Sequence, residues 1–476
     1  MSDIQMTKSQ EKAFNNLKVF LDDPTSNVFI LKGYAGTGKT TLMKLFIKEL
    51  ERKEVNFALL ASTGRAAKIL SNATGHRTRT VHSEIYKFTD LNQDLDKVAK
   101  SREETKVDAT GQLYLNFELT PRDDDDDGVP HYYIIDEASM ISDAKDTNSM
   151  QAVFGSGRLL NDLLTYDPRG KFIFIGDICQ LPPVSQAISP ALDATYLQQE
   201  YGLKVYESEL TQIVRQEQGN DITLSAQQMR KLFYHPQPWK WAKFPLRGYR
   251  NIHVLSSQTE LINKYIQFVK EKGFNAATLL CFSNKQSNET TRLLRPVFGH
   301  HTPYLESGDL LLVTQNNLIS GLMNGDLVVV EEVRTVERRA GLTFLHVKVK
   351  ELFTGQSYAQ LLISDVLYGN LTNITQAQQK ELFIDFYYRM KAKGIKQKSL
   401  LFKQQMMEDP YLNALRAVYG YSLTCHKSQG GEWDYVFLDI ARSVPGMQKP
   451  YVYQWMYTAM TRARKELYVV QDFWVM

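Results

Sequence analysis

The segment GYAGTGKT at residues 33–40 constrains the fold of this chain more than any other feature. It follows the apolar run VFILK and precedes TLMKLFIKEL, whose apolar spacing predicts a helix. Glycines let the backbone wrap closely around phosphate oxygens, with its N–H groups pointing inward at a helix N-terminus. Strand, glycine turn and helix in this order therefore predict a phosphate-binding loop.

The loop also supplies side chains for nucleotide binding. Lys39 can reach the β- and γ-phosphates as a point charge, and the Thr40 hydroxyl can bind Mg²⁺. The predicted nucleotide-binding residues of this segment are Gly33, Gly36, Thr37, Gly38, Lys39, Thr40 and Thr41.

Two acidic residues, Asp136 and Glu137, end the later apolar run YYII. The carboxyl end of a buried strand is where an α/β sheet presents its site. We expect Asp136 to hold Mg²⁺ and Glu137 to orient or deprotonate the attacking water. After a third run, KFIFIGD, comes Gln180, whose amide can sense a terminal phosphate with a donor and an acceptor.

Apolar runs alternate with helical patterns along the chain, which predicts an α/β fold with two parallel-sheet domains covered by helices. The first domain is expected over residues 1–203, with strands at VFILKG, NFALLA, HYYIIDE and KFIFIGD. The second is expected over residues 204–323 and 408–476, with strands at ATLLCFS, YGYSLTCH, DYVFLDI and KELYVVQD. Residues 88–129 look like an excursion from the first domain, and residues 324–407 like a small β-barrel inserted into the second.

Composition excludes several classes of protein. With 476 residues, 43% of them hydrophobic, the chain can fill more than one core. No long uncharged apolar stretch or N-terminal leader is present, so we expect a cytoplasmic protein without a membrane partner. Cys179, Cys281 and Cys425 lack the spacing of a zinc site or a disulfide framework. The net charge of +3 is too small to indicate a nucleic-acid partner by itself.

The three blocks GYAGTGKT, IIDEASM and GDICQLPPV resemble the signatures of superfamily 1 helicases, in the RecD-like and Dda-like 5′→3′ branch. Three later blocks, LTQIVRQ at 210–216, YSLTCHKSQGGEWD at 421–434 and YTAMTRARK at 457–465, are similar to that family's motifs IV, V and VI in the correct order. The resemblance spans nearly the whole chain and implies two RecA-like motor domains with ATP and Mg²⁺ between them.

The resemblance implies further nucleotide contacts. Gln10 corresponds to the glutamine that reads the adenine edge, and Arg215 and Arg462 to two arginines that the second motor domain supplies to the γ-phosphate. A guanidinium fork suits charge that builds on phosphoryl oxygens in the transition state. Gly430 and Glu432 are the corresponding motif V contacts to the nucleotide.

The resemblance also implies a track for single-stranded DNA. Motifs Ia and Ib, at residues 59–70 and 78–86, supply the candidate contacts in the first domain, and motif V supplies those in the second. The expected DNA-binding residues are Thr63, Arg65, His82, Thr424, His426, Lys427 and Ser428. Ser62 stands where the family usually has proline, which affects the expected geometry of the DNA contact.

By resemblance, the excursion at 88–129 carries the pin that splits the duplex, and the inserted barrel is of the Src-homology-3 type. Tyr114 and Phe117 are the candidate outward aromatics of the pin, with hydrophobic packing as the alternative. The acidic run at 123–127 is expected to be a solvated loop.

Together these features predict an ATP-dependent DNA helicase that moves 5′ to 3′ on single strands and unwinds tailed duplexes as a monomer. Single-strand-binding, replication and repair proteins are the candidate protein partners. The alternative is a DNA-binding ATPase switch that remodels a partner complex without unwinding. A nuclease is disfavoured because the chain lacks a convincing cluster of metal-binding carboxylates outside the ATP site.

Overall fold

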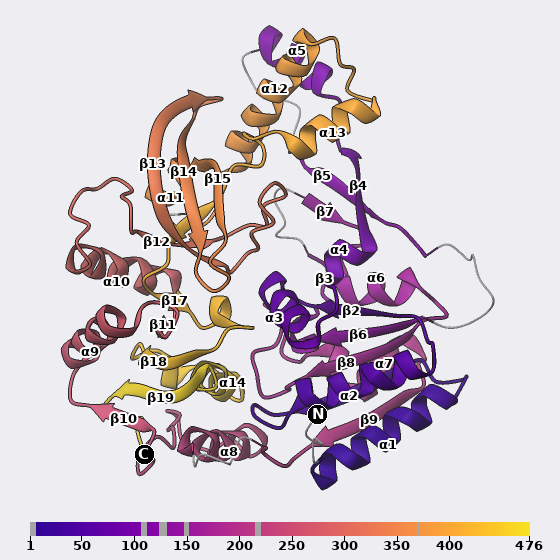
Figure 1. The fold of residues 1–476 in the computed structure, drawn as a ribbon, viewed down its shortest axis with the longest axis vertical. Coiled ribbons are helices and arrows are strands. Elements are labelled where there is room, and N and C mark those ends of the chain that lie inside the picture. Colours follow the sequence, from indigo (N-terminus) through magenta and orange to yellow (C-terminus); the bar gives the residue numbers. More distant parts are fainter. Residues whose placement is uncertain (1–5, 106–111, 123–130, 147–151, 215–219, 370) are drawn as a thin grey trace.

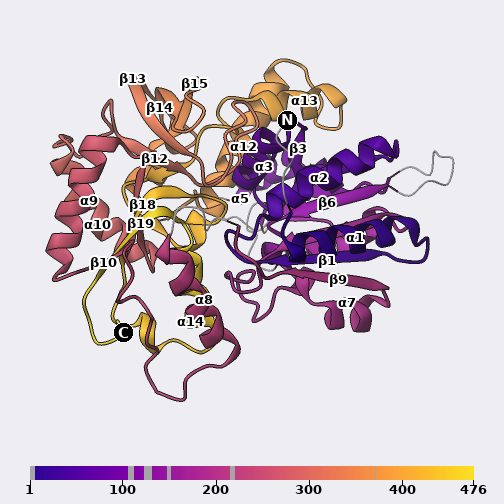
Figure 2. The ribbon, with the colours of Figure 1, turned by 60° about the horizontal axis from the view of Figure 1, so that its bottom comes forward.

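The computed structural model describes residues 6–105, 112–122, 131–146, 152–214, 220–369 and 371–476. Two parallel sheets with flanking helices lie side by side, and an antiparallel sheet and a group of helices lie above them in the view of Figure 1. Figure 2 confirms that the two parallel sheets are neighbours and do not merely overlap in projection. The predicted α/β fold with two motor domains is confirmed.

The first parallel sheet has six strands in the order β3-β2-β6-β8-β1-β9. Its central strands are buried on both faces, which explains their unbroken apolar runs. One face is covered by α1, Lys8–Asp22, and α2, Lys39–Arg52, with α3, Gly64–Thr74. The other face is covered by α4, Val81–Ile85, α6, Leu159–Tyr166, and α7, Ala194–Tyr201. The strands are β1 Val28–Gly33, β2 Phe57–Ala61, β3 Thr78–Thr80, β6 Tyr132–Asp136, β8 Lys171–Gly176 and β9 Val205–Leu210.

The last strand of this sheet corrects the expected domain boundary at residue 203. Strand β9 pairs in parallel with β1, so the first motor domain extends at least to Leu210. Its sequence, VYESEL, has three polar residues between its apolar ends, as an edge strand with one solvated face tolerates. This strand could therefore not be recognised by the continuous apolar runs that mark the buried strands.

The second parallel sheet has five strands in the order β10-β19-β18-β11-β17. The strands are β10 Ile252–Leu255, β11 Ala277–Cys281, β17 Leu423–Thr424, β18 Trp433–Asp439 and β19 Ala463–Val470. The accompanying helices are α8 Asp221–Tyr234, α9 Gln258–Lys272, α10 Asn284–Val297 and α14 Tyr451–Met460. Side chains from all four helices share one buried core with the strands.

An antiparallel sheet of five strands, in the order β15-β14-β13-β12-β16, forms the insertion in the second domain. The expected limits of 324–407 are too narrow for it, because the sheet recruits a strand from each side of that segment. Helix α11, Ser364–Tyr368, follows the sheet's third long strand, and α12, Gln376–Ala392, and α13, Leu400–Glu408, form a separate helical group. The strands are β12 Leu310–Val313, β13 Leu327–Arg339, β14 Leu342–Glu351, β15 Ser357–Ile363 and β16 Ala417–Tyr419.

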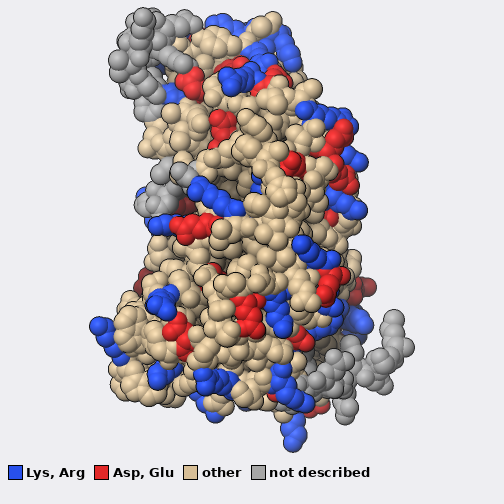
Figure 3. Space-filling view, turned by 90° about the vertical axis from the view of Figure 1, so that its left-hand side faces the viewer, with Lys and Arg blue, Asp and Glu red and all other residues tan. Residues whose placement is uncertain are grey.

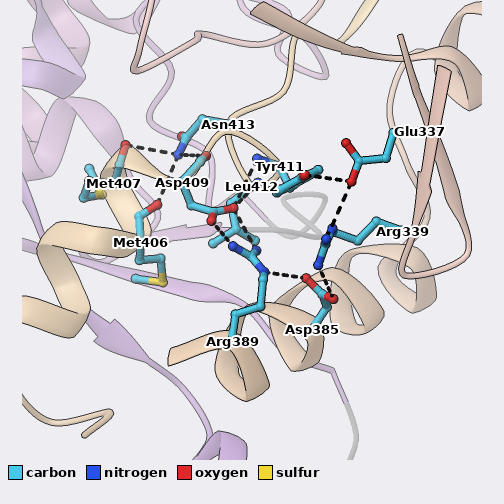
Figure 4. Close-up of polar contacts among 10 residues, drawn as sticks. All are labelled: Glu337, Arg339, Asp385, Arg389, Met406, Met407, Asp409, Tyr411, Leu412 and Asn413. Carbon is cyan, nitrogen blue, oxygen red and sulfur yellow. Dashed lines mark hydrogen bonds and ion pairs between the residues drawn. The ribbon is translucent and has the colours of Figure 1, made fainter. Parts of the chain in front are cut away.

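A polar network fastens this helical group to the end of the β13–β14 hairpin (Figure 4). Arg389 on α12 pairs with Asp385 on the same helix and with Asp409 after α13. Arg339 at the end of β13 reaches the same Asp385. Two arginines that share one carboxylate hold the helices and the hairpin in a single unit.

The excursion expected at 88–129 forms one helix and part of a small three-stranded sheet, whose first strand begins earlier and whose third strand lies beyond those limits. The sheet consists of β4, Tyr86–Leu91, β5, Leu115–Leu119, and β7, Ala152–Phe154, and the helix is α5, Leu95–Thr105. Phe117 on β5 stacks on a phenylalanine of β7, with ring centroids 4.7 Å apart, which agrees with the packing alternative for this side chain. The acidic run at 123–127 lies outside the described residues.

Helix α5 extends away from the first sheet and packs against α12, which belongs to the second domain (Figure 1). Apolar residues of both segments share one core. The Leu95 N–H donates to Gln397 Oε1 at 2.8 Å, and Tyr387 Oη donates to Asp96 Oδ1 at 2.5 Å. The two motor domains are therefore joined at their insertions as well as at the sheets.

Three features of the described residues concern cysteines, metal-binding side chains and membrane-spanning helices. All three cysteines are buried and free. No cluster of three metal-binding side chains occurs in the described part of the chain. Within the same residues, none of the helices combines the length and apolarity needed to cross a bilayer.

Candidate nucleotide and nucleic-acid sites

The glycine-rich loop joins the end of β1 to the first turn of α2. Gly38 is the residue before α2 and has a φ of 77°, in the left-handed region that glycine tolerates best. A Cβ there would also lie 2.4 Å from Gln10 Nε2, so no larger residue fits without displacing that side chain. Lys39 Nζ donates to the carbonyl oxygens of Gly33 at 2.7 Å and Tyr34 at 3.3 Å, which holds it over the loop.

A cavity of about 700 Å³ opens at this loop, between the two motor domains. Its size is within the range of small-molecule and cofactor sites. The first domain contributes the predicted residues Gly36, Gly38, Lys39, Thr40, Thr41, Arg65, Asp136, Glu137 and Gln180. The second contributes the predicted residues Gly430, Glu432 and Arg462. Predicted residues from distant parts of the sequence thus meet in one cavity.

Asp136 and Glu137 lie where β6 leaves the sheet. Glu137 has a φ of 51°, which is unusual for a residue with a side chain and stores local strain at the site. Its N–H donates to Asp136 Oδ1 at 2.9 Å, which fixes the first carboxylate beside the loop. Burial, followed by the charge of Glu137, raises the pKa of Asp136, so this site favours a bound cation.

Gln180 is buried near the same cavity, with 4% of its surface exposed. Among the residues that the structure describes, its Oε1 atom has no hydrogen-bond partner. A buried acceptor without a partner carries a desolvation cost that a ligand can remove. This oxygen and the carboxylates of Asp136 and Glu137 are ligands of the kind that bind Mg²⁺ or its coordinated water.

Gln10 is held between helix α1 and the loop. Its Oε1 accepts from the Thr7 N–H at 2.9 Å as part of a capping box at the start of α1. Its Nε2 donates to the carbonyl oxygen of Thr37 at 3.2 Å. The structure therefore places Gln10 against the loop, with its Oε1 and Nε2 atoms each making one of these hydrogen bonds.

Arg462 lies at the end of α14 and lines the cavity from the second domain. Its Nε donates to the carbonyl oxygen of Thr458 at 3.0 Å, and its Nη1 to that of Gly431 at 3.3 Å. These neutral acceptors leave its charge uncompensated by an ion pair within the described residues. Arg215, its expected companion, lies outside the described residues.

Arg65 was expected to contact DNA, and the structure places it inside the seam between the domains. Its guanidinium carbon lies 4.6 Å from the centre of the Trp433 ring and 4.7 Å from that of Phe353. Its Nη1 has no hydrogen-bond partner in the part of the chain that the structure describes. Burial lowers the pKa of Arg65 to about 10, which leaves it charged at neutral pH.

The other expected DNA residues of the first domain lie near the start of α3 and on α4. Thr63 caps α3, its hydroxyl accepting from the Ala66 N–H at 3.2 Å. His82 packs edge-on against Phe154, with ring centroids 5.3 Å apart, and burial lowers its pKa. The Thr63 hydroxyl thus caps the start of α3, and the His82 ring packs against Phe154.

The expected DNA residues of the second domain follow β17. Thr424 accepts from the Lys427 N–H at 3.4 Å, and Ser428 is fully buried, donating to the Cys425 carbonyl oxygen at 2.7 Å. His426 Nε2 lies 3.2 Å from Tyr451 Oη. Burial lowers the pKa of both His426 and Lys427. Of these residues, His426 and Lys427 retain partial exposure.

Sequence reasoning missed several residues of the cavity and its walls. Asp326 and Glu351 of the insertion line the cavity opposite α3, and Lys68 on α3 forms an ion pair with Asp326. Tyr34 in the loop lies beneath Arg230 of α8. An ion pair between two distant segments, such as Lys68 and Asp326, leaves no pattern in the sequence. Tyr34 could have been found, because it stands within the glycine-rich motif itself.

Comparisons with known proteins agree with this architecture. Residues 5–231 match the family model described as an AAA domain, and residues 419–470 match that of the UvrD-like helicase C-terminal domain. The ATP-dependent RecD2 DNA helicase of Deinococcus radiodurans is 24% identical over 92% of this chain and 46% of its own length. The ATP-dependent DNA helicase dda of Enterobacteria phage T4 is 39% identical over 79 residues, which are 16% of this chain and 18% of that protein.

A crystal structure of Pif1 helicase from Bacteroides aligns with 99% of this chain and 93% of its own chain, at 16% identity and a TM-score of 0.46. The chain spans less than half the length of two curated relatives that it matches along most of its own sequence. The two family-model matches and the RecD-type and Dda relatives, taken with the ordered sequence motifs, agree with a superfamily 1B helicase of the RecD-like and Dda-like group.

Proposed function

We propose that this chain is an ATP-dependent DNA helicase that moves 5′ to 3′ on single-stranded DNA and hydrolyses ATP between its two motor domains. One observation carries the proposal: the cavity at the glycine-rich loop is lined by the phosphate-binding residues of the first domain and by Arg462, Gly430 and Glu432 of the second. A site built from two domains changes when they move, so the chemical cycle and the motion are linked.

The proposed roles in hydrolysis follow from the chemistry of each side chain. Lys39 and the loop amides bind the phosphates, and Glu137 orients or deprotonates the attacking water. Thr40 and Asp136 would hold Mg²⁺, which when bound neutralises charge on the phosphates. Gln180 supplies a neutral hydrogen-bonding group to the terminal phosphate.

We assign the arginine contact on the γ-phosphate to Arg462, with Arg215 as its companion from the family resemblance. An arginine that neutralises the transition state is typically worth about 10³–10⁵ in rate. Because Arg462 belongs to the second domain, its contribution depends on how closely the domains approach each other. This dependence is the proposed link between ATP hydrolysis and movement.

For DNA we propose Thr63, His426 and Lys427 as contacts to the strand. Small hydroxyls and single cations suit sequence-independent contacts to the phosphate backbone. Thr424 shapes the turn that presents Lys427, and the buried Ser428 holds that turn from within. Lys and Arg are interspersed with Asp and Glu on the face shown in Figure 3, which agrees with local contacts rather than a strongly basic surface.

ATP hydrolysis with and without single-stranded DNA tests the enzymatic part of the proposal. We expect DNA to stimulate hydrolysis by the unmodified chain and Lys39→Ala to abolish it. Arg52→Ala is a matched control, because Arg52 ends the same helix on an exposed surface. Turnover in Lys39→Ala equal to that of the unmodified chain would contradict the proposed site.

Strand displacement from a tailed duplex separates the helicase from the alternative ATPase switch. The helicase hydrolyses ATP and displaces the strand from a duplex with a 5′ tail. A switch that only remodels a partner hydrolyses ATP on single-stranded DNA and displaces nothing. Hydrolysis without displacement would therefore favour the switch.

A further inference from the structure

Helix α14 belongs to the second domain, but one of its faces contacts the loop that carries Gln180 in the first. Gln454 Nε2 donates to the carbonyl oxygens of Ile178 and Gln180, at 3.1 Å and 3.2 Å. One turn later, Thr458 Oγ1 accepts from the Leu181 N–H at 2.8 Å. The helix thus fixes the backbone on both sides of the Gln180 side chain.

Tyr457 lies at the centre of this face and contacts two segments of the first domain at once. Its Oη donates to Asp177 Oδ2 at 2.7 Å and accepts from the N–H of Ala35, in the glycine-rich loop, at 3.1 Å. Tyr457 and Asp177 are each 1% exposed. A single hydroxyl therefore joins the glycine-rich loop, the Gln180 loop and the second domain.

The carboxylate of Asp177 depends on this contact. Its other oxygen accepts from the Cys179 N–H at 3.0 Å, and burial raises the pKa of Asp177. Moving the domains apart would remove the tyrosine and leave a buried carboxylate oxygen without its partner. Loss of a hydrogen bond to a buried charged group is unfavourable, so the contact favours one spacing of the domains.

We propose that Tyr457 is a positioning residue that transmits the spacing of the two domains to the glycine-rich loop and to Gln180. Tyr457 is not among the residues that line the nucleotide cavity, and it acts through Ala35 and Asp177. The inference rests on the proposed function and deepens it. It explains how the approach of the two domains affects both the glycine-rich loop and the Gln180 loop. No other described side chain contacts both segments with one polar atom across the domain boundary.

Tyr457→Phe tests this role, because it removes the hydroxyl and keeps the ring. We expect the DNA-stimulated kcat for ATP to fall about ten- to a hundredfold, the equivalent of one buried hydrogen bond to a charged group, while KM for ATP changes by less than about threefold. Asp177→Asn should lower kcat similarly, and the double variant should be no worse than either single one. Additive losses, or an unchanged kcat in Tyr457→Phe, would overturn the proposal.

Tyr265→Phe is the matched control. It also removes a buried tyrosine hydroxyl, which donates to the Tyr421 carbonyl oxygen at 2.9 Å, but both residues lie within the second domain. We expect its kcat to stay within about twofold of the unmodified chain, because substitutions that share no partner with the site usually act independently of it. An equal loss of kcat in Tyr265→Phe would show that any buried hydroxyl in this core matters and would overturn the positioning role.

Domain spacing provides a readout that does not require hydrolysis. Fluorophores on Lys12→Cys and Lys270→Cys, at exposed positions of α1 and α9, report the distance between the domains by energy transfer. With ATPγS and Mg²⁺ the unmodified chain should shift to one spacing, and Tyr457→Phe should shift less. An equal shift in both would overturn the inference alone, whereas the absence of DNA-stimulated hydrolysis in the unmodified chain would overturn the proposed function alone.

Discussion

Arg65 of the first motor domain stacks on Trp433 of the second, with its guanidinium carbon 4.6 Å from the ring centre. The Phe353 ring of the insertion is 4.7 Å from this carbon and packs edge-to-face against Trp433, so the cation lies in the corner between two aromatic rings. A desolvated cation–π contact contributes about 2 kcal/mol. The first domain is therefore fastened to the second motor domain and to its insertion by one side chain.

Replacing Arg65 with lysine should weaken this fastening, because an ammonium keeps the charge but lacks the planar group that packs against the rings. We expect DNA-stimulated ATP hydrolysis by Arg65→Lys to fall about tenfold, as the loss of one desolvated cation–π contact predicts. Steady-state hydrolysis at saturating single-stranded DNA measures it. Arg52→Lys, at an exposed ion pair of the same domain, is the control and should behave like the unmodified chain.

Gly431 should not tolerate a side chain, because of the close approach of Arg65. A Cβ at this position would lie 2.5 Å from Arg65 Cζ and 2.7 Å from both terminal nitrogens, which the two rings hold in place. We expect Gly431→Ala to lose most of its DNA-stimulated hydrolysis. Adding Arg65→Ala should remove the clash, so the double variant should match Arg65→Ala alone. A double variant as inactive as Gly431→Ala would contradict this explanation.

Gln10 caps α1 and, by the family resemblance, is expected to contact adenine, and matched variants can separate these two roles. We expect Gln10→Ala to raise KM for ATP about tenfold and to reduce the preference for ATP over GTP, because it removes the proposed contact to adenine and the hydrogen bond to the loop. Thr7→Ala removes the other half of the capping box and should cost about 1 kcal/mol of helix stability without changing KM. Equal KM values for the two variants would assign Gln10 to capping alone.

Asp136 should reduce the stability of the nucleotide-free protein while serving the reaction. Its pKa is raised in the folded state, so its ionised form opposes folding, and stability is lost as the pH rises above the ordinary range of a carboxyl group. At pH 7.5 without nucleotide or Mg²⁺, Asp136→Asn should therefore melt at a higher temperature than the unmodified chain, although it should not hydrolyse ATP. The exposed variant Glu200→Gln should leave the melting temperature unchanged, and a lower melting temperature for Asp136→Asn would contradict the sign of the shift.

The sequence alone could predict the parts of the fold that local patterns determine. The buried strands β1, β6 and β8 are unbroken apolar runs, and glycine spacing identifies the loop after β1. The polar edge strand β9 and the strands β12 and β16 could not be assigned, because their sheets are determined by pairing with distant segments. Pairing of that kind leaves no periodic signal in the strand itself.

The contacts between the domains were harder to predict than the residues of either domain. Arg65 packs against Phe353 and Trp433, two residues far apart in the sequence whose proximity no sequence pattern predicts. The face of α14 did carry a signal, because Gln454, Tyr457 and Thr458 form a polar stripe on an otherwise apolar helix. A polar stripe in a fully buried helix indicates a partner that must satisfy it.

The most direct test of the account is unwinding of DNA duplexes with a 5′ or a 3′ tail in the presence of ATP and Mg²⁺, by the unmodified chain and by Arg462→Lys. The account predicts that the unmodified chain displaces the strand only from the 5′-tailed duplex, and that Arg462→Lys binds single-stranded DNA but displaces neither. Full displacement by Arg462→Lys, or a preference for the 3′ tail, would contradict it.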